Sequence, residues 1–517
     1  MPPPRLQSVE YHDLTSRSSI DSFASVSDWE QAGLVLPSSR SHRSFWRKLW
    51  RSTPTWQPQR PRPRRFASPR WSSIRQLLRI GLSVLVVLIS CTALFFPSYT
   101  RLPPHFQSVV EQATQSDQHG RANPRNERIF IAAILYDPEG TIAGGRWGES
   151  LLQLIDLLGE DNVFLSIYEN DSDEQGEQAL RQLEDRVACN KSIQSDLHLD
   201  LSTFPRVTVP GGAQRVKRTD YLAELRNRAL RPLDDPAAQP YDRILYLNDV
   251  IFDPIDAVQL LFSTNAADTP DGVARYRAAC AVDFINPFKF YDTYATRDLE
   301  GYGIGLQFYP WFSTAGHARS RQDVLAQKDA VRVRSCWGGM IAFNATYFQR
   351  PDRPVRFRAD RDLFYDGSEC CIIHADLQDS PTTASVDDIF DSGVYMNPYV
   401  RTAYTERSFR WLRTTRRFER LYSLVHGIVS RVAGFPRFNP RRTEIAGEVV
   451  RERVWVPDAR HSNGGSYQTI ERVADNDGFC GDGFGGRRGL QLIREHRQPG
   501  EDGWEEIPVP VALSFAS

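Results

Sequence analysis

The sequence predicts an α/β fold with a mostly parallel central sheet and a single N-terminal transmembrane helix. From Arg128 onward, short apolar runs alternate with helical patterns, which is typical of sheets whose two faces are both covered by helices. One long uncharged apolar run precedes this region. The chain has 517 residues, 41% of them hydrophobic and 25% charged, so we expect one large globular domain with extra segments, or two domains.

The apolar run, residues 80–96, is at the short end of what crosses a bilayer. A cleaved signal peptide begins within a few residues of the N-terminus, whereas 79 residues precede this run. A buried helix of a soluble protein is the other alternative. The flanks favour a membrane span, because twelve Arg or Lys and no Asp or Glu lie from Arg40 to Arg79. The positive-inside rule then keeps the N-terminus cytoplasmic, which is type II topology.

The remaining segments are predicted from composition. Residues 1–79 are rich in Ser, Pro and Arg, so we expect a disordered basic cytoplasmic tail, whose Arg residues fit anionic lipid better than nucleic acid. Residues 97–127 are expected to form a stem, residues 128–404 the main domain, and residues 405–517 an extension packed on it. A basic amphipathic stretch at 408–432 either packs on the core or rests on a membrane surface. We favour packing, because an anchored protein needs no second attachment.

The sheet elements follow in chain order. Strands are predicted at 129–136, 163–168 and 243–247, with helices at 150–158 and 220–230 and a further helix through Leu183. Polar residues gather where these strands end: Asp137, residues 169–173, Asn248 and Asp249. In open α/β sheets this edge binds ligands, so the sequence predicts a binding site there.

Motifs narrow the choice of ligand. No GxxxxGK[ST], HExxH or GxSxG pattern occurs, which weakens the NTPase, zincin and α/β-hydrolase interpretations. The GxGxxG match at 481–486 follows no strand–helix pattern, so we interpret it as a loop. A sheet that binds a charged nucleotide without a phosphate loop needs a hard cation held by side-chain oxygens, and Asp249 is positioned for that role. Six cysteines lie beyond the apolar run without a CxxC pair, which fits a secretory lumen and leaves their pairing open.

Several motifs together resemble one protein family. In chain order they are YENDSDE (168–174), RTDYLAELRNRAL (218–230), ILYLNDVIFDP (244–254), CAVDF (280–284), FYDTYATRDLEG (290–301), SCWGGM (335–340) and SECCIIHADL (368–377). Over roughly residues 127–500 the chain resembles the fungal α-1,3-mannosyltransferase family, glycosyltransferase family 69, which includes the cryptococcal mannosyltransferase and capsule-associated proteins. The resemblance implies a GT-A-like nucleotide-sugar-binding fold, a GDP-mannose donor, a divalent metal such as Mn2+, retention at the anomeric carbon and a Golgi type II enzyme.

The resemblance also suggests how the donor is held. Asp249 corresponds to the last carboxylate of the DxD motif with which GT-A enzymes bind a metal on the donor diphosphate. Such a metal stabilises the leaving nucleotide as its charge develops. Leu247 stands where the first Asp would be, so Asn248 or Asp253 would have to help.

Two more segments are assigned to the donor. Arg226 and Asn227 lie on the helix before that strand, where a guanidinium can bind phosphate through two hydrogen bonds. A solvated helix face is the alternative for this pair. Trp337, Gly338 and Gly339 form a loop in which the glycines let the backbone approach the sugar and the aromatic ring packs on it. A core Trp with a tight turn is the alternative here.

Catalytic, metal and acceptor roles complete the assignment. By analogy with GT-A enzymes, Glu369 faces the acceptor and His374 completes the metal shell, and His374 is alternatively a structural histidine. Asp283 and Glu369 are the carboxylates assigned to nucleophilic or substrate-orienting roles. Three residues are assigned to acceptor binding, with an ordinary ion pair as the alternative: Asp292, Arg297 and Asp298.

The sequence therefore predicts a retaining glycosyltransferase that moves α-mannose from GDP-mannose to the 3-hydroxyl of a mannose-containing glycan in the Golgi lumen. One alternative keeps the GT-A fold and changes the donor or the linkage. Another is a noncatalytic lumenal scaffold that holds glycans. We expect no nucleic-acid partner, because the basic tail adjoins a membrane span and the large domain is acidic.

Overall fold

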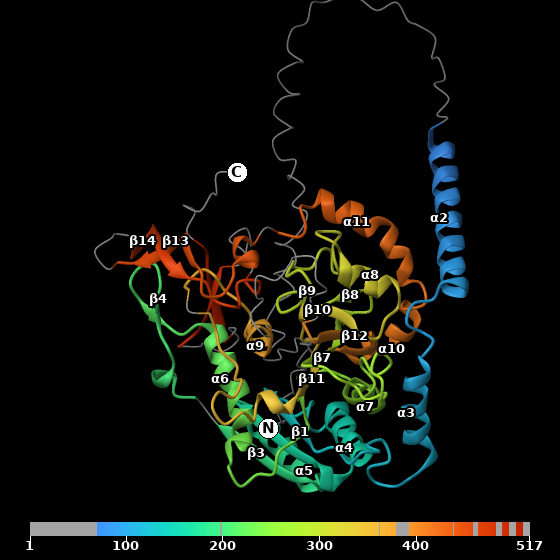
Figure 1. Cartoon of the computed structure of the whole chain (residues 1–517). Helices are drawn as coiled ribbons and strands as arrows, with labels where there is room; N and C mark the ends of the chain where they lie inside the picture. The colour runs from blue at the N-terminus through green and yellow to red at the C-terminus, as the bar shows by residue number, and fades with distance from the viewer. Residues whose placement is uncertain are drawn as a thin grey trace, which may run out of the picture.

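The computed structural model describes residues 70–196, 199–360, 362–378, 392–437, 439–458, 464–481, 489–495 and 503–509 (Figure 1). Most of the predicted cytoplasmic tail, residues 1–69, lies outside the described residues. The same holds for residues 482–486 of the GxGxxG match.

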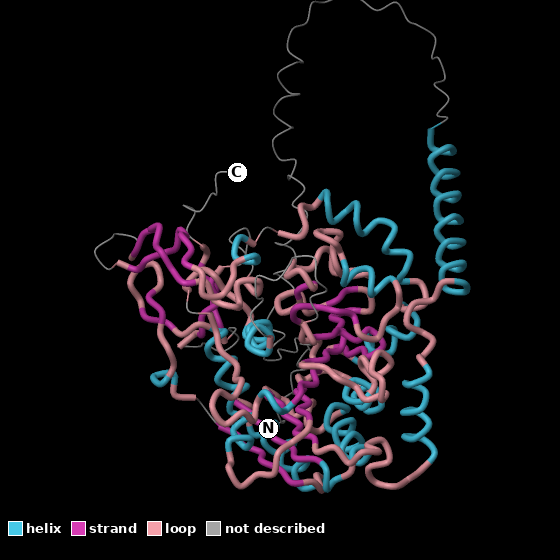
Figure 2. The backbone as a smooth tube through the Cα atoms, in the orientation of Figure 1, coloured by secondary structure: helices cyan, strands magenta, loops and turns pink. Residues whose placement is uncertain are grey.

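A ten-stranded mixed sheet organises the molecule (Figure 2). Its strands are β1 (Ile129–Leu135), β2 (Val163–Asn170), β3 (Asn190–Asp196), β6 (Arg243–Leu247), β7 (Ala278–Asn286), β8 (Lys289–Phe290), β9 (Arg297–Asp298), β10 (Val331–Ser335), β11 (Met340–Asn344) and β12 (Val394–Ala403). Their order is β3-β2-β1-β6-β11-β7-β12-β10-β9, and β8 pairs with β7. Strands β8, β10 and β11 run against the others, so the sheet is mostly parallel.

Strand β1 shows why the predicted strands are continuous apolar runs. All seven of its residues are buried. Ile129, Ile131 and Ala133 contribute to one hydrophobic cluster, whereas Phe130 and Ala132 contribute to another. Successive side chains of a strand point to opposite faces, so both faces of the sheet carry a core.

Helices cover both faces of the sheet. They are α4 (Arg146–Leu158), α5 (Glu174–Arg186), α6 (Arg218–Leu230), α7 (Pro254–Phe262) and α9 (Glu369–Leu377). Helix α6 packs on β1 and β2, and α4 packs on α7. Three of the five begin at a side-chain cap, because Asp173, Asp253 and Ser368 accept hydrogen bonds from first-turn N–H groups.

The other elements lie around this layer. The helices are α2 (Arg70–Phe95), α3 (Pro104–Gln115), α8 (Arg319–Leu325), α10 (Glu406–Thr415) and α11 (Ser423–Val432). Short 3-10 turns are η1 (Glu160–Asn162), η2 (Leu201–Thr203), η3 (Arg231–Asp234), η4 (Ala345–Tyr347), η5 (Glu419–Tyr422) and η6 (Pro440–Thr443). Small two-stranded sheets pair β4 (Val207–Thr208) with β5 (Gln214–Arg215), β13 (Val449–Pro457) with β14 (Gly465–Val473), and β15 (Leu490–Ile493) with β16 (Trp504–Ile507).

Helix α2 contains the apolar run. Its residues 75–95 are long and apolar enough to cross a membrane, and none of that window is buried. The helix stands beside the body of the protein (Figure 1) and begins before the predicted start at residue 80.

The segment expected to be a stem packs on the domain instead of spacing it from α2. The N–H of Ser98 donates to the carbonyl of Arg416 at 3.0 Å. Tyr99 and Phe106 are buried in the core, and α3 packs on α7. Only Phe96 and Pro97 separate α2 from the first buried residue.

The C-terminal extension is tied to the domain by covalent and backbone links. The disulfide Cys371–Cys480 joins it to α9, and isolated bridges pair Lys217 with Leu492 and Gly367 with Gly481. A second disulfide, Cys280–Cys336, lies within the domain. Cys189 and Cys370 are buried thiols, so four of the six cysteines beyond α2 are paired.

Candidate functional site

Four side chains from separate segments meet at the carboxyl end of β6, and we call them the Arg226 cluster. Arg226 is on α6, Asn248 follows β6, Trp337 lies in the loop between β10 and β11, and Glu369 begins α9. Nε of Arg226 donates to Oε1 of Glu369 at 3.2 Å, and its Nη1 donates to Oδ1 of Asn248 at 3.4 Å. The guanidinium carbon lies 4.3 Å from the ring centroid of Trp337. The exposed fractions of these residues are 0, 2, 4 and 3% for Arg226, Asn248, Trp337 and Glu369.

The buried guanidinium is stabilised from every side. Besides Trp337, the rings of Tyr246 and Phe357 lie 5.5 and 5.7 Å from its central carbon, within range of cation–π attraction. The charge of Glu369 lies at the N-terminus of α9, where the helix dipole favours an anion. A buried ion pair needs such compensation, because removing one partner typically costs about 3–5 kcal/mol.

Two donors of the cluster have no hydrogen-bond partner among the described residues. They are Nδ2 of Asn248 and Nε1 of Trp337, and both atoms are buried. Both backbone polar groups of Asn248 form hydrogen bonds. Its N–H donates to the carbonyl of Gly339, and its carbonyl accepts from Nε1 of Trp147, both at 2.9 Å. An unsatisfied buried donor costs about 1–3 kcal/mol. A ligand that presents oxygen atoms would satisfy both.

Two glycines bring the loop close to the sheet. Gly338 and Gly339 have φ values of +64° and +68°, which side chains other than glycine rarely adopt. A Cβ on Gly338 would lie 2.0 Å from the carbonyl oxygen of Ala281, and one on Gly339 would lie 2.5 Å from Val250. The loop conformation therefore requires glycine at both positions.

Asp292 holds this loop in place. Its Oδ2 accepts hydrogen bonds from the N–H groups of Trp337 and Gly338, at 2.9 and 3.3 Å. It also accepts from the N–H of Ala295 and from Oγ1 of Thr296. Burial raises the pKa of Asp292 despite these bonds. The residue assigned to the acceptor thus binds the glycine loop.

Asp283 supports Asp292 from the end of β7. Its Oδ1 accepts from the N–H of Asp292 at 3.0 Å, and its Oδ2 accepts from the hydroxyl of Tyr404 at 3.1 Å. Burial, followed by the charge of Asp292, raises the pKa of Asp283 well above its ordinary value. A chain of bonds therefore runs from Asp283 through Asp292 to the loop of Trp337.

The other predicted donor residues lie beside the cluster. Both amide atoms of Asn227 bond the backbone of Phe357 at 2.8 Å, which fixes the segment carrying that ring. Asp249 follows Asn248 and is half-buried. Leu247, where a DxD motif has its first carboxylate, is fully buried in the core. Asp253 caps α7 by accepting from the N–H of Ile255.

His374 faces the polypeptide interior. Its Nε2 donates to the carbonyl of Cys336 at 2.6 Å, and burial lowers its pKa to about 4, so the ring is neutral. Its Nδ1 has no hydrogen-bond partner among the described residues. Within that part of the chain, no three His, Cys, Asp or Glu side chains come close enough together to hold a metal ion.

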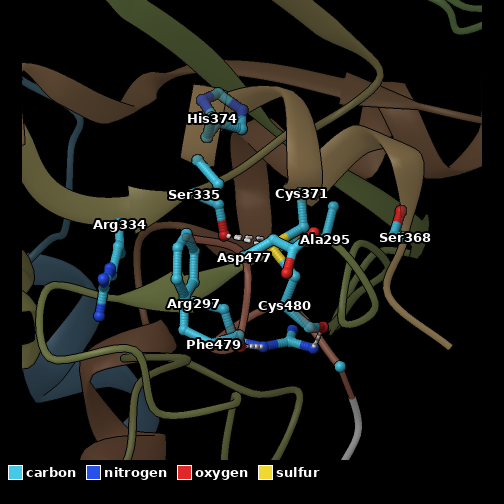
Figure 3. Close-up of a disulfide and its surroundings, with 12 residues drawn as sticks. Ala295, Arg297, Arg334, Ser335, Ser368, Cys371, His374, Asp477, Phe479 and Cys480 are labelled. Carbon is cyan, nitrogen blue, oxygen red and sulfur yellow. Dashed lines mark hydrogen bonds between the residues drawn. A yellow bond between two sulfur atoms is a disulfide. The ribbon is translucent and has the colours of Figure 1, made fainter. Parts of the chain in front are cut away.

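Arg297 and Asp298 stabilise turns. Arg297 is buried and donates to the carbonyls of Phe479 and Cys480 and to carbonyls of its own loop (Figure 3). Asp298 accepts from the N–H groups of Glu300 and Tyr302, and burial raises its pKa to about 7. These bonds, rather than an open groove, surround the two residues that we assigned to the acceptor.

Polar side chains at the ends of β1 and β2 mostly accept hydrogen bonds from backbone N–H groups of the loops that follow. Oδ2 of Asp137 accepts from the N–H groups of Ile142 and Ala143, both at 2.9 Å. Glu169 accepts from the N–H of Ser172. A surface hollow of about 470 Å³ lies on α10, and none of its lining residues belongs to the Arg226 cluster.

The sequence profile of one protein family, described as Cryptococcal mannosyltransferase 1, matches residues 128–376. This region belongs to the cryptococcal mannosyltransferase family. It contains the whole Arg226 cluster, and membership supports a glycosyltransferase activity.

Other comparisons add little to the family assignment. No curated protein matches the sequence significantly. A solved structure, the mannosyltransferase PcManGT from Pyrobaculum calidifontis in complex with GDP-Man and Mn2+, is similar with a TM-score of 0.31 and 12% identity. The match covers 67% of this chain and 75% of that chain. A likeness this low carries no argument about this protein.

Sequence reasoning missed part of the cluster's surroundings. Trp147 bonds Asn248 across 101 residues, and Tyr404 bonds Asp283 across 121 residues. The rings of Tyr246 and Phe357 were likewise not assigned to the site. No local pattern marks any of these contacts, because each joins segments that only the folded sheet brings together.

Proposed function

We propose that this protein is a retaining α-1,3-mannosyltransferase of GT-A type, anchored by α2 in the Golgi membrane with its domain in the lumen. It transfers mannose from GDP-mannose to the 3-hydroxyl of a mannose-containing glycan. The observation that carries the proposal is the Arg226 cluster, a buried charged cluster with two unpaired donors, in the region that belongs to the cryptococcal mannosyltransferase family.

Asn248 and Trp337 supply the direct contacts to the donor. Their unpaired side-chain N–H groups are suited to oxygen atoms of a nucleotide sugar, which carries both phosphate and hydroxyl oxygens. Arg226 is entirely buried and already engaged by Glu369 and Asn248, so it acts as a positioning residue under the donor.

Asp249 is the residue that would hold a divalent metal. Ions of this class are commonly bound through one or two carboxylates plus substrate phosphates and water, and a half-buried Asp at a strand end fits that mode. When bound, such an ion supplies charge stabilisation for the leaving diphosphate.

Glu369 is the carboxylate proposed to contact the sugars. Asp283 is less suited to that role, because its oxygens bond Asp292 and Tyr404. In the transfer, the bond from mannose C1 to the diphosphate oxygen breaks, and a bond from C1 to O3 of the acceptor forms on the same face. The acceptor proton leaves on a phosphate oxygen of the nucleotide product.

The test uses the full chain in detergent with GDP-mannose, UDP-sugar controls and an α-mannobioside acceptor, with Mn2+ or a chelator. Product linkage is read by NMR. An α-1,3-linked product that needs GDP-mannose and metal, disappears with Asp249→Asn and persists with Asp271→Asn supports the proposal. Asp271 is the matched control because it is an exposed carboxylate in the loop between α7 and β7. Another linkage or donor would correct the specificity, and no transfer by folded protein would favour a glycan-binding scaffold.

A further inference from the structure

Helix α11 presents its apolar side chains to the outside. Five of its ten residues are exposed and apolar, and we call them the α11 apolar face: Leu424, Val425, Ile428, Val429 and Val432. Their exposed fractions run from 43 to 84%. The spacing places them on one side of the helix. Exposed apolar residues are ordinary when scattered, but a contiguous patch marks an interaction site.

Polar side chains fix the opposite side of α11 to the domain. His426 and Ser430 are buried. Nε2 of His426 donates to the carbonyl of Leu306 at 2.9 Å, and its Nδ1 accepts from Nη1 of Arg321 at the same distance. Oγ of Ser430 accepts from the N–H of Leu306. These bonds set the rotation of the helix about its axis, so the apolar face cannot turn inward without breaking them.

The α11 apolar face adjoins the candidate membrane span. The C-terminal turns of α2 contact η5, which runs directly into α11 at Ser423. The N–H of Ser98, three residues after α2 ends, bonds the carbonyl of Arg416 just before η5. Figure 1 shows α11 on the side of the body where α2 stands. If α2 crosses a bilayer, α11 begins at the surface of that bilayer.

The charged side chains around α11 are mostly basic. Arg417 and Arg431 are exposed, and Arg420 and Arg437 are half-buried. The acidic residue within 417–437 is Glu419, which is buried and bonded by the buried guanidinium of Arg401. Exposed charge beside the apolar face is therefore positive. Basic side chains at the edge of such a face can donate hydrogen bonds to lipid phosphate groups.

We propose that the α11 apolar face lies in the lipid interface beside α2 and fixes the orientation of the domain on the membrane. Amphipathic helices of this type lie in the membrane plane with their apolar side among the acyl chains. The inference goes beyond the sugar chemistry, and it rests on α2 as the membrane span.

The test places a fluorescent label on α11 in full-length protein embedded in nanodiscs of phosphatidylcholine and phosphatidylserine. In a Cys91→Ser background, Ile428→Cys carries an NBD label, and Gln182→Cys on exposed α5 is the matched control. Helix α5 lies at the end of the molecule opposite α11 (Figure 1). We expect the label at 428 to shift to shorter wavelength and to be quenched by spin-labelled lipid, and the label at 182 to do neither.

Other outcomes overturn the proposal. Equal quenching at the two positions would mean that α11 has no special contact with lipid. A wavelength shift without lipid quenching would mean that protein, such as a second copy of this chain, covers the face. As a second variant, Leu424→Gln with Val432→Gln changes only exposed side chains and should weaken quenching at 428 while leaving the fold intact. The readout uses no donor or acceptor, so it is independent of the proposed transferase activity.

Discussion

Arg226 is the residue on which the candidate site depends most, because it carries a charge with no access to solvent. Its partners come from three other segments of the chain, and each supplies a different interaction: an ion pair, an amide oxygen and an aromatic face. A single residue thereby aligns Asn248, Trp337 and Glu369. Its contribution to stability and to catalysis should be separable by substitution.

Glu369→Gln tests the ion pair. The variant leaves the guanidinium of Arg226 buried without a counter-charge, so we expect a loss of about 3–5 kcal/mol in the free energy of unfolding, measured by urea denaturation. The control is Glu149→Gln, which removes an exposed pair with Arg186 and should change little. A Glu369→Leu, Arg226→Met double variant should regain much of the stability and remain inactive. Equal effects of Glu369→Gln and Glu149→Gln would contradict the assignment.

Asp298 provides a pH test. Its folded-state pKa is raised to about 7 by burial, whereas an unfolded Asp titrates near its ordinary value of about 4. Between these values the folded state binds more protons, so stability falls as pH rises through the window. Asp298→Asn should remove this part of the slope and still accept the two backbone bonds. Urea unfolding at pH 5 to 8 measures it, and an unchanged slope would refute the role of burial.

The glycine loop is the element with the least tolerance for change. Gly339→Ala adds a Cβ that collides with Val250 and strains a backbone at positive φ, at a cost of about 1–3 kcal/mol. Because Gly339 accepts the N–H bond of Asn248, we also expect kcat to fall. Gly447→Ala is the matched control, since Gly447 has a positive φ but open space around its Cβ position. Equal effects of the two substitutions would argue against close packing of the loop.

The disulfide between α9 and the extension is the second testable element. Cys371–Cys480 closes a loop with a sequence separation of 109, and loss of such a link typically costs about 2–5 kcal/mol. We expect Cys371→Ser with Cys480→Ser to lower stability in urea and to increase hydrogen exchange in α9, which begins with Glu369. Cys189→Ser, which changes an unpaired buried cysteine, serves as the comparison. Unchanged exchange in α9 would mean that noncovalent contacts, among them those of Arg297 and the backbone bridges, hold the extension without the disulfide.

At the scale of the whole molecule, strands β1, β2 and β6 are predictable from the sequence, because strands buried on both faces are unbroken apolar runs. The strands predicted at 129–136, 163–168 and 243–247 are all present. Strand β12 is harder to recognise, since it contains Pro398 and shifts register along β7. Arg226 and Glu369 lie 143 positions apart in the sequence. The motifs identified both residues as site candidates, but nothing in the sequence predicted that they would form an ion pair.

The segment after α2 is a second case in which sequence composition did not predict the packing. Residues 97–127 are mostly polar, which suggests a spacer, yet Tyr99 and Phe106 are core residues. Two aromatic side chains in a polar stretch are a weak pattern. Only tertiary packing shows that they belong to the domain.

The short connection between α2 and the domain limits how the protein can be cut. Many anchored enzymes are shed when a protease cleaves an exposed tether, but here Ser98 is already buried two residues after Phe96. A protease needs an extended stretch of backbone, which this junction does not offer without local unfolding. A soluble version for biochemistry should for the same reason begin at residue 98, because a start at residue 128 would discard the side chains of Tyr99 and Phe106 that complete the core.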